Sequence, residues 1–187
     1  PPRPGDVQRM FVRDDGVWVT LAYGTARYDG TRWLGWTGQP PRHKGTRPVR
    51  LLPSSNGSLT ALFYDDAELA TYKNGEWIFE SWVPGCLSCP AGGRFVDAIV
   101  DRAGVLWVVI ASGDQLGLVK REPGKKAKAF ATLVKSTRTA ALAESSTSRI
   151  LIGTADGVWN GDGDHVDQVE ETAGLRASRV VAESDTL

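Results

Sequence analysis

Two cysteines, Cys86 and Cys89, have the residue type and spacing best suited to chemistry, and they lie in a loop rich in Gly and Pro. A CxxC pair can attach haem, bind zinc, act in redox catalysis or form a local disulfide. Haem attachment requires His directly after the second Cys, where this chain has Pro90. A redox-active pair normally lies at a helix N-terminus, and the sequence predicts no helix after Cys89. We therefore expect a Cys86–Cys89 disulfide in an oxidising compartment, or two plain thiols in a reducing one.

Metal binding and catalysis find less support in the residue types. A structural zinc site usually takes four ligands, whereas the chain has two histidines, His43 and His165. His43 lies on the preceding loop between repeats, and in a propeller this loop is on the same face as the loop with the two cysteines. Cys86, Cys89 and His43 therefore offer at most a three-ligand or intermolecular site. The chain contains no HExxH, phosphate-binding loop, dinucleotide fingerprint or Ser/His/Asp set. The sequence thus predicts no metal, no cofactor and a binding function rather than catalysis.

Composition narrows the class of protein. The 187 residues include 22 Lys and Arg and 22 Asp and Glu, so the formal net charge is zero. This balance argues against a nucleic-acid partner or an anionic membrane surface. The most apolar uncharged stretch, residues 103–113, is far shorter than the roughly 20 residues that span a bilayer. With 21 Gly, 10 Pro, seven Trp and one Met, the chain favours turns and aromatic-rich strands over long helices.

The elements that position these residues recur along the chain. Four segments share a turn followed by a short apolar strand, at residues 16–19, 57–61, 104–108 and 149–152. If Trp18, Thr60, Trp107 and Leu151 are equivalent, successive repeats are offset by 42, 47 and 44 residues. A period in the forties is typical of the four-stranded blades of a β-propeller.

Each repeat contains the other three strands as well. A first strand precedes each segment, at residues 7–12, 49–52, 95–100 and 139–143. A third strand ends in a turn, at residues 28–30, 73–75, 122–124 and 160–163, and a fourth strand holds Trp33, Trp77, Phe130 or Val166. We therefore predict an all-β propeller of four-stranded antiparallel blades, with boundaries near 7–48, 49–93, 94–136 and 137–178. A further blade is predicted to start at 179–187.

Part of this pattern resembles a known family. The segment 15–19, DGVWV, with the segment 24–30, GTARYDG, and Trp33 looks like the G-x-[LV]-W-[VI]-G-T…G-[LV]-x-R-Y-[DN]-G…W pattern of two-component regulator propeller repeats. The segment 151–159, LIGTADGVW, resembles it more weakly. Repeat two has Thr60 instead of the strand Trp, and repeat three lacks the Tyr-Asp-Gly turn. The resemblance implies a bacterial sensor-type propeller with a signalling role and a periplasmic or extracellular location.

Both ends of the chain supply a first strand, so they cannot complete one shared blade. We therefore expect residues 1–187 to be a portion of a larger ring, with the remaining blades coming from the same longer chain or from another chain. A closed four-bladed ring and a ring completed by a second copy are the alternatives.

Acidic residues recur on the loops between second and third strands, which in a propeller all emerge on one face beside the central channel. They are Asp65 and Asp66 in repeat two, Asp114 in repeat three and Asp156 in repeat four, with Tyr23 in repeat one. We expect these loops to bind a protein or a small polar ligand, helped by Trp36 and Trp82 on the loops between blades. The alternative is that each Asp serves its own turn by local hydrogen bonding.

Four of the other tryptophans are predicted to be structural. Trp18, Trp107, Trp33 and Trp77 occupy matching strand positions, so we assign them to packing between sheets. The favoured function is a non-catalytic recognition module. The alternatives are a lyase or glycan-active enzyme with its site at the central channel, and a scaffold subunit of an assembly.

Overall fold

The computed structural model describes residues 7–13, 16–21, 24–38, 48–53, 59–63, 68–73, 76–81, 94–112, 115–133, 140–145, 147–162 and 165–177. Within these residues the chain forms four antiparallel sheets, each made of four consecutive strands. This arrangement confirms the predicted all-β repeat. The chain divides into two compact units, Pro1–Arg47 and Pro48–Leu187.

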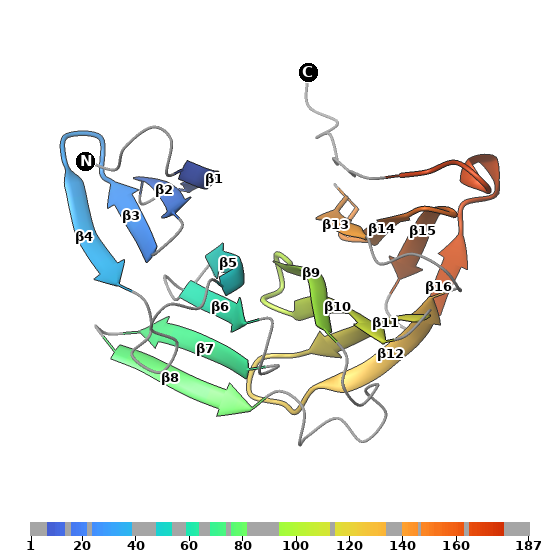
Figure 1. The fold of residues 1–187 in the computed structure, drawn as a ribbon. Helices are drawn as coiled ribbons and strands as arrows, with labels where there is room; N and C mark the ends of the chain where they lie inside the picture. Colours follow the sequence, from blue (N-terminus) through green and yellow to red (C-terminus); the bar gives the residue numbers. More distant parts are fainter. Residues whose placement is uncertain are drawn as a thin grey trace. The chain divides into compact units, whose positions relative to one another are not determined.

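The first unit contains one sheet, of strands β1 (Val7–Arg13), β2 (Gly16–Leu21), β3 (Gly24–Tyr28) and β4 (Trp33–Gly38) (Figure 1). Strand β2 begins at Gly16, which has φ +128 and whose added Cβ would clash with the carbonyl oxygen of Tyr28. Val19 and Ala26, paired across β2 and β3, are buried and form the small core of this sheet.

The β3–β4 turn is held by one carboxylate. Asp29 Oδ1 accepts hydrogen bonds from the backbone N–H groups of Arg32 and Thr31, both at 2.9 Å, and from Thr31 Oγ1 at 2.7 Å. These bonds, of which the one from the Arg32 backbone has the largest effect, lower the pKa of Asp29 from 3.8 to about 2. The Tyr28-Asp29-Gly30 turn predicted from the sequence therefore has a defined electrostatic basis.

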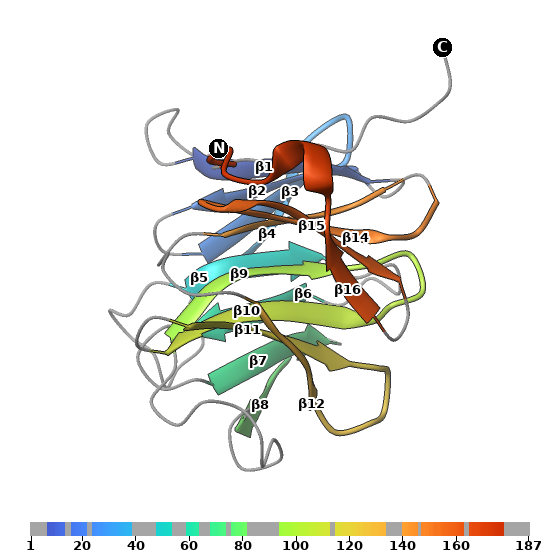
Figure 2. The ribbon, with the colours of Figure 1, turned by 90° about the vertical axis from the view of Figure 1, so that its right-hand side faces the viewer.

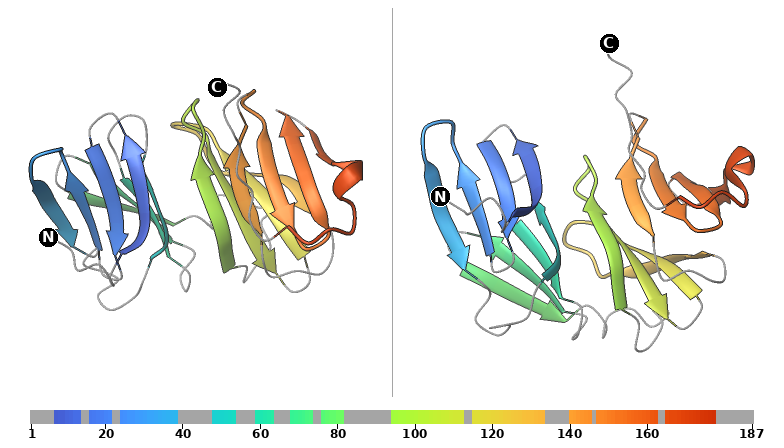
Figure 3. Two further views of the ribbon diagram at one scale, coloured as in Figure 1. Left: turned by 90° about the horizontal axis from the view of Figure 1, so that it is seen from above. Right: turned by 45° about the horizontal axis from the view of Figure 1, so that its top comes forward.

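The second unit contains three sheets. The strands of the first are β5 (Pro48–Pro53), β6 (Leu59–Phe63), β7 (Glu68–Lys73) and β8 (Glu76–Ser81). The next sheet has β9 (Arg94–Val100), β10 (Leu106–Ser112), β11 (Gln115–Arg121) and β12 (Lys128–Leu133). The last has β13 (Ala141–Glu144), β14 (Ile150–Thr154), β15 (Gly157–Asp162) and β16 (His165–Gln168), followed by the 3-10 turn η4 (Glu170–Thr172). Figure 3 shows the strands of each sheet running side by side in chain order.

Strand β9 lies between β5 and β13, so the first strands of these three sheets are neighbours (Figure 2 shows β5 beside β9). Because side chains alternate across a strand, the central sheet buries both of its faces. One face contributes Leu106, Val108 and Ile110 to a cluster with Leu52, Leu62 and Leu69 of the sheet before it. The opposite face contributes Trp107, Val109 and Ala111 to a cluster with Leu142, Ile150 and Ile152 of the sheet after it.

These contacts distinguish the two sides of the sheets in the second unit. We call the side that packs on the following sheet the forward face and the side that packs on the preceding sheet the backward face. Each fully buried Leu or Ile side chain at such a junction contributes about 1.5–3 kcal/mol. Sheet-on-sheet burial therefore holds the second unit together.

Trp107 confirms the packing role that its repeat position predicts. It is 5% exposed, and its Nε1 donates to Asp101 Oδ2 at 2.8 Å. The other oxygen of Asp101 accepts from the Val105 backbone N–H at 2.8 Å, so this carboxylate fixes both the β9–β10 turn and the indole. Phe130 packs edge-on against the Trp107 ring, with centroids 5.1 Å apart.

Trp33 differs from the packing expectation. Its side chain is 37% exposed, and its ring contacts Tyr28 with centroids 5.4 Å apart. The physical reason is its position at the start of the edge strand β4, directly after the exposed turn residues 29–32. Trp77 is partly buried on β8.

Candidate functional site

The described residues include one complete member of the predicted site, Asp156. For Trp36, which lies on β4, the structure describes the backbone alone. The other predicted residues lie outside the described part of the chain, and so do the candidate disulfide and metal ligands: Tyr23, Asp65, Asp66, Asp114, Trp82, Cys86, Cys89 and His43. The site is therefore built from Asp156 and from the strands that carry the remaining loops.

Asp156 lies in the tight turn that joins β14 to β15. Its backbone N–H donates to Thr154 Oγ1 at 3.2 Å, and that hydroxyl donates to the carbonyl oxygen of Gly157 at 3.0 Å. Gly157 has φ +132, which other residues rarely adopt, and its added Cβ would lie 2.7 Å from the carbonyl oxygen of Thr172. The turn conformation is thus fixed by local bonds and by glycine.

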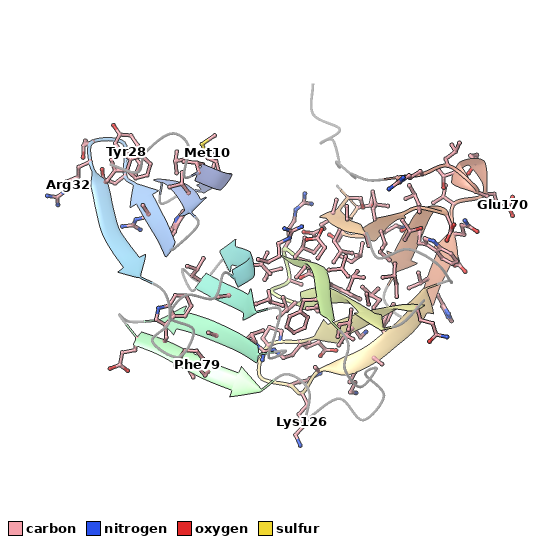
Figure 4. All side chains as sticks on the ribbon, viewed as in Figure 1. Met10, Tyr28, Arg32, Phe79, Lys126 and Glu170 are labelled. Atoms are coloured by element: carbon pink, nitrogen blue, oxygen red, sulfur yellow. The ribbon has the colours of Figure 1, made fainter. Side chains whose placement is uncertain are left out.

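Residues 169–177, which we call the covering segment, pack on this turn. Its Gly174 N–H and the Gln168 side chain both donate to the carbonyl oxygen of Asp156, at 3.0 and 2.8 Å. Its Ala177 N–H donates to the carbonyl oxygen of Thr154 at 2.8 Å. Figure 4 labels Glu170, an exposed acidic side chain of this segment. The covering segment therefore holds Asp156 in place and leaves it partly buried.

Topology places the turn of Asp156 and the C-terminal end of β10, at Ser112, at the same end of their sheets. The Arg102 N–H, just after β9, donates to Glu144 Oε2 at 3.0 Å, at the end of β13, so the C-terminal ends of these two strands meet. In a four-stranded meander, the loop from the second to the third strand returns to the end at which the first strand begins. Ser112 and Thr154, at which the second strands of these two sheets end, therefore lie at the same end of their sheets.

The sequence analysis missed Asp97, the buried charged residue at the junction of three sheets. Asp97 is 5% exposed and lies on β9, between β5 and β13. Its Oδ1 accepts from Arg50 Nε of β5 and from the Ala98 N–H at 2.8 Å, while its Oδ2 accepts from the Leu142 N–H of β13 at 3.0 Å. The available signal was a single acidic residue inside the apolar run 95–100. We assign Asp97 to holding the sheets together rather than to the ligand site.

Among the residues that the model describes, no three His, Cys, Asp or Glu side chains are grouped closely enough to hold a metal ion. No helix in that same part of the chain has the length and apolar character needed to cross a membrane.

Comparison with known proteins identifies the fold. No family model matches the chain, and no curated protein matches it. Among solved structures, the chain is similar to the extracellular domain of the putative one-component system BT4673 from B. thetaiotaomicron, with TM-score 0.66 and 15% identity over 98% of this chain and 26% of that one. It is also similar to a catalytically inactive virginiamycin B lyase from Staphylococcus aureus with quinupristin, with TM-score 0.64 and 14% identity over 90% of this chain and 57% of that one.

A third similar structure is YCF48 bound to D1 peptide, with TM-score 0.59 and 13% identity over 92% of this chain and 57% of that one. The chain thus spans between about a quarter and about three-fifths of the length of these structures. At such low identity the likeness concerns the fold alone. Together with the four meander sheets, it shows that the chain has a β-propeller fold built from four-stranded blades.

Proposed function

We propose that this chain is the recognition module of a bacterial extracytoplasmic signalling or cell-surface protein, of the two-component regulator propeller type. It binds a protein segment or a small polar ligand and performs no catalysis. The observation that supports the proposal is that Ser112 and Thr154, where the second strands of two neighbouring sheets end, lie at the same end of these sheets. The loop with Asp65 and Asp66 occupies the same place in the preceding repeat.

The chemistry of these loops favours a cationic ligand. In the sequence, the expected loops between second and third strands carry four carboxylates, those of Asp65, Asp66, Asp114 and Asp156, although the chain as a whole has no net charge. A local group of like charges attracts an opposite charge over about a Debye length, roughly 8–10 Å at physiological salt. Tyr23, Trp36 and Trp82 would add ring faces that attract ammonium and guanidinium groups. A segment rich in Lys or Arg is therefore the ligand class we propose.

The similar structures support a binding role and an extracytoplasmic location. One is an extracellular domain, and another is described as bound to a peptide. An oxidising compartment also agrees with the proposed Cys86–Cys89 disulfide. The virginiamycin B lyase shares the fold, which does not fix a function.

The proposal can be tested with two labelled peptides of equal length, one of alternating Lys and Gly and one of alternating Glu and Gly. We expect the chain to bind the Lys peptide and not the Glu peptide, with affinity falling as salt rises. A variant with Asp65, Asp66 and Asp114 changed to Asn should bind the Lys peptide at least about tenfold more weakly, which corresponds to about 1.4 kcal/mol.

The matched control is Glu122→Gln, which removes an acidic charge from the β11–β12 turn, at the opposite end of the same sheet as Asp114. This variant should bind like the parent chain. Equal affinity of the parent and the triple Asn variant for the Lys peptide, or equal binding of both peptides, would contradict the proposed site.

A further inference from the structure

Positive charge gathers at one end of the third sheet, opposite the end at which β10 reaches Ser112. The β9–β10 and β11–β12 turns share this end, because β9 and β11 are both antiparallel to β10. A Cβ added at Gly104 of the first turn would lie 3.5 Å from Pro123 Cγ of the second, so the two turns are in contact. We call these two turns, with the adjoining residues 120, 121 and 128, the basic end. Its cationic residues are Arg102, Lys120, Arg121, Lys125, Lys126 and Lys128.

The carboxylates at the basic end are fewer than its cations, and each of them accepts a hydrogen bond. Asp101 accepts at 2.8 Å from the indole N–H on β10. Glu144, at the end of β13, accepts from the Arg102 backbone N–H at 3.0 Å. Glu122 accepts from the Lys125 side chain. Three carboxylates therefore face six cations, and this end has an excess of positive charge.

The pKa of Glu122 responds to this excess. The hydrogen bond and the charge of Lys125 lower the pKa of Glu122 below its ordinary value of 4.5, and the charges of Lys120 and Lys128 lower it further. Cations from both strands of the hairpin therefore act on the same point. The basic end is positive as a group.

Lys126 and Lys128 are the cations best placed to meet a ligand. Both side chains are exposed, and neither forms an ion pair with another residue in the described part of the chain. Figure 4 shows Lys126 pointing away from the sheets. A lysine ammonium is a compact charge on a flexible stem, so it can follow anions whose positions are not fixed.

The residue types of the basic end favour a broad anionic surface over a peptide or a nucleic acid. Among the described residues, the exposed large apolar side chains lie on β1, β4, β8 and the covering segment. The basic end therefore offers no exposed ring or aliphatic anchor for a peptide or a base. A single exposed ion pair contributes little, because water and salt screen it, so binding by charge alone requires many anions at once.

We propose that the basic end binds an anionic membrane surface through Lys126, Lys128 and the neighbouring cations. Negatively charged headgroups attract several cations at the same time, and these small attractions add. The zero net charge of the whole chain conceals this end, because acidic residues elsewhere offset it. Binding through this end leaves the opposite end of the sheets, with the turn of Asp156, facing away from the membrane.

The test is co-sedimentation of the chain with vesicles made of equal parts of phosphatidylcholine and phosphatidylglycerol, compared with vesicles of phosphatidylcholine alone. We expect binding to the anionic vesicles only, and weaker binding as salt rises. Each Lys near an anionic surface contributes about fivefold in affinity, so changing both Lys126 and Lys128 to Gln should weaken binding about 25-fold. Both side chains are exposed, so the double variant should keep the fold, which circular dichroism checks.

The matched control for the single change Lys126→Gln is Arg176→Gln. Arg176 is exposed on the covering segment, which packs on the Asp156 turn at the other end of the fourth sheet. Arg176→Gln should bind the vesicles like the parent chain, whereas Lys126→Gln should bind about fivefold more weakly. Glu122→Gln acts in the opposite direction, because it removes a negative charge from the basic end, and should bind severalfold more tightly.

Several results would overturn the proposal. They are equal binding to both kinds of vesicle, a double variant that binds like the parent chain, and an Arg176→Gln variant weakened as much as Lys126→Gln. Tight binding of double-stranded DNA or of the Glu peptide that is lost in the double variant would assign the basic end to that partner instead. Binding of the Lys peptide is measured separately, so failure here leaves the proposed recognition role standing.

Discussion

Replacing Asp97 by Ala tests how the sheets of the second unit are joined. The substitution removes the acceptor shared by the Arg50 side chain of β5 and the Leu142 N–H of β13. Because Asp97 is 5% exposed, water has little access to take the place of the carboxylate. The change therefore affects two junctions between sheets at once.

The magnitude follows from the groups left without a partner. A buried N–H that loses its acceptor costs about 1–3 kcal/mol, and this applies to Leu142. Breaking a buried ion pair by removing one partner costs about 3–5 kcal/mol, but the Arg50 side chain is 20% exposed and recovers part of this in water. We expect Asp97→Ala to lower the free energy of unfolding by about 3–5 kcal/mol. The total free energy of unfolding of an ordinary protein is about 5–15 kcal/mol, so this is a large share of it.

Urea denaturation followed by tryptophan fluorescence and circular dichroism measures this change. Asp97→Asn keeps one carbonyl oxygen and should cost about half as much as Asp97→Ala. Asp167→Ala, at an exposed position on β16, is the control and should cost less than about 0.5 kcal/mol. A loss below about 1 kcal/mol for Asp97→Ala would refute the role that we assign to this carboxylate.

Three further predictions concern turns and the cysteines. Since the pKa of Asp29 is lowered to about 2, its turn stabilises the folded state above pH 4 and loses that contribution as the pH falls towards 2; a carboxyl NMR titration with a midpoint near the ordinary 3.8 would contradict this. Gly157→Ala should cost at least about 2 kcal/mol in urea denaturation, against about 1 kcal/mol for Gly30→Ala, which also has positive φ but no atom within 4 Å of the added Cβ; equal costs would refute the clash. Thiol titration of the unfolded, unreduced chain should find no free thiol at Cys86 and Cys89, and two free thiols would exclude the disulfide.

The strands were predictable because their signals are local. The apolar runs before Asp14, Asp101 and similar turns became first strands, and the predicted fourth-strand residues Trp33, Trp77 and Phe130 all lie on β4, β8 and β12. Residue types that favour turns, such as Gly, Asp and Asn, set these strand boundaries, and they can be recognised in a single sequence. The short η4 turn and the covering segment were not predicted, since their bonds to Thr154 and Asp156 depend on tertiary contacts.

The burial of each side chain was harder to predict than the strand on which the residue lies. Trp33 and Trp107 both sit at repeat positions that favour packing, yet Trp33 is 37% exposed and Trp107 is 5% exposed. Trp107 lies on an inner strand and packs on the following sheet, whereas Trp33 begins an edge strand beside an exposed turn, and a repeat pattern does not contain that information. Asp97 was missed for the same reason, because its partners lie 47 and 45 residues away in the chain.

The candidate site was predicted as a set of loops. Asp156 lies in the turn between β14 and β15, and β10 ends at Ser112 at the same end of the neighbouring sheet. The sequence did not reveal that the carbonyl oxygen of Asp156 is bound by Gln168 and Gly174. Recognition of a basic segment remains a proposal that the peptide titrations decide.

The most direct measurement for the stacked-sheet account is hydrogen exchange at the Leu142 amide, followed by NMR. This N–H lies on the first strand of the last sheet and donates to Asp97 of the preceding sheet at 3.0 Å. If consecutive sheets stack through their first strands, exchange at Leu142 will be as slow as at the central amides of β10 and will become fast in Asp97→Ala. Rapid exchange at Leu142 in the parent chain, at the rate of an exposed edge strand, would contradict the account.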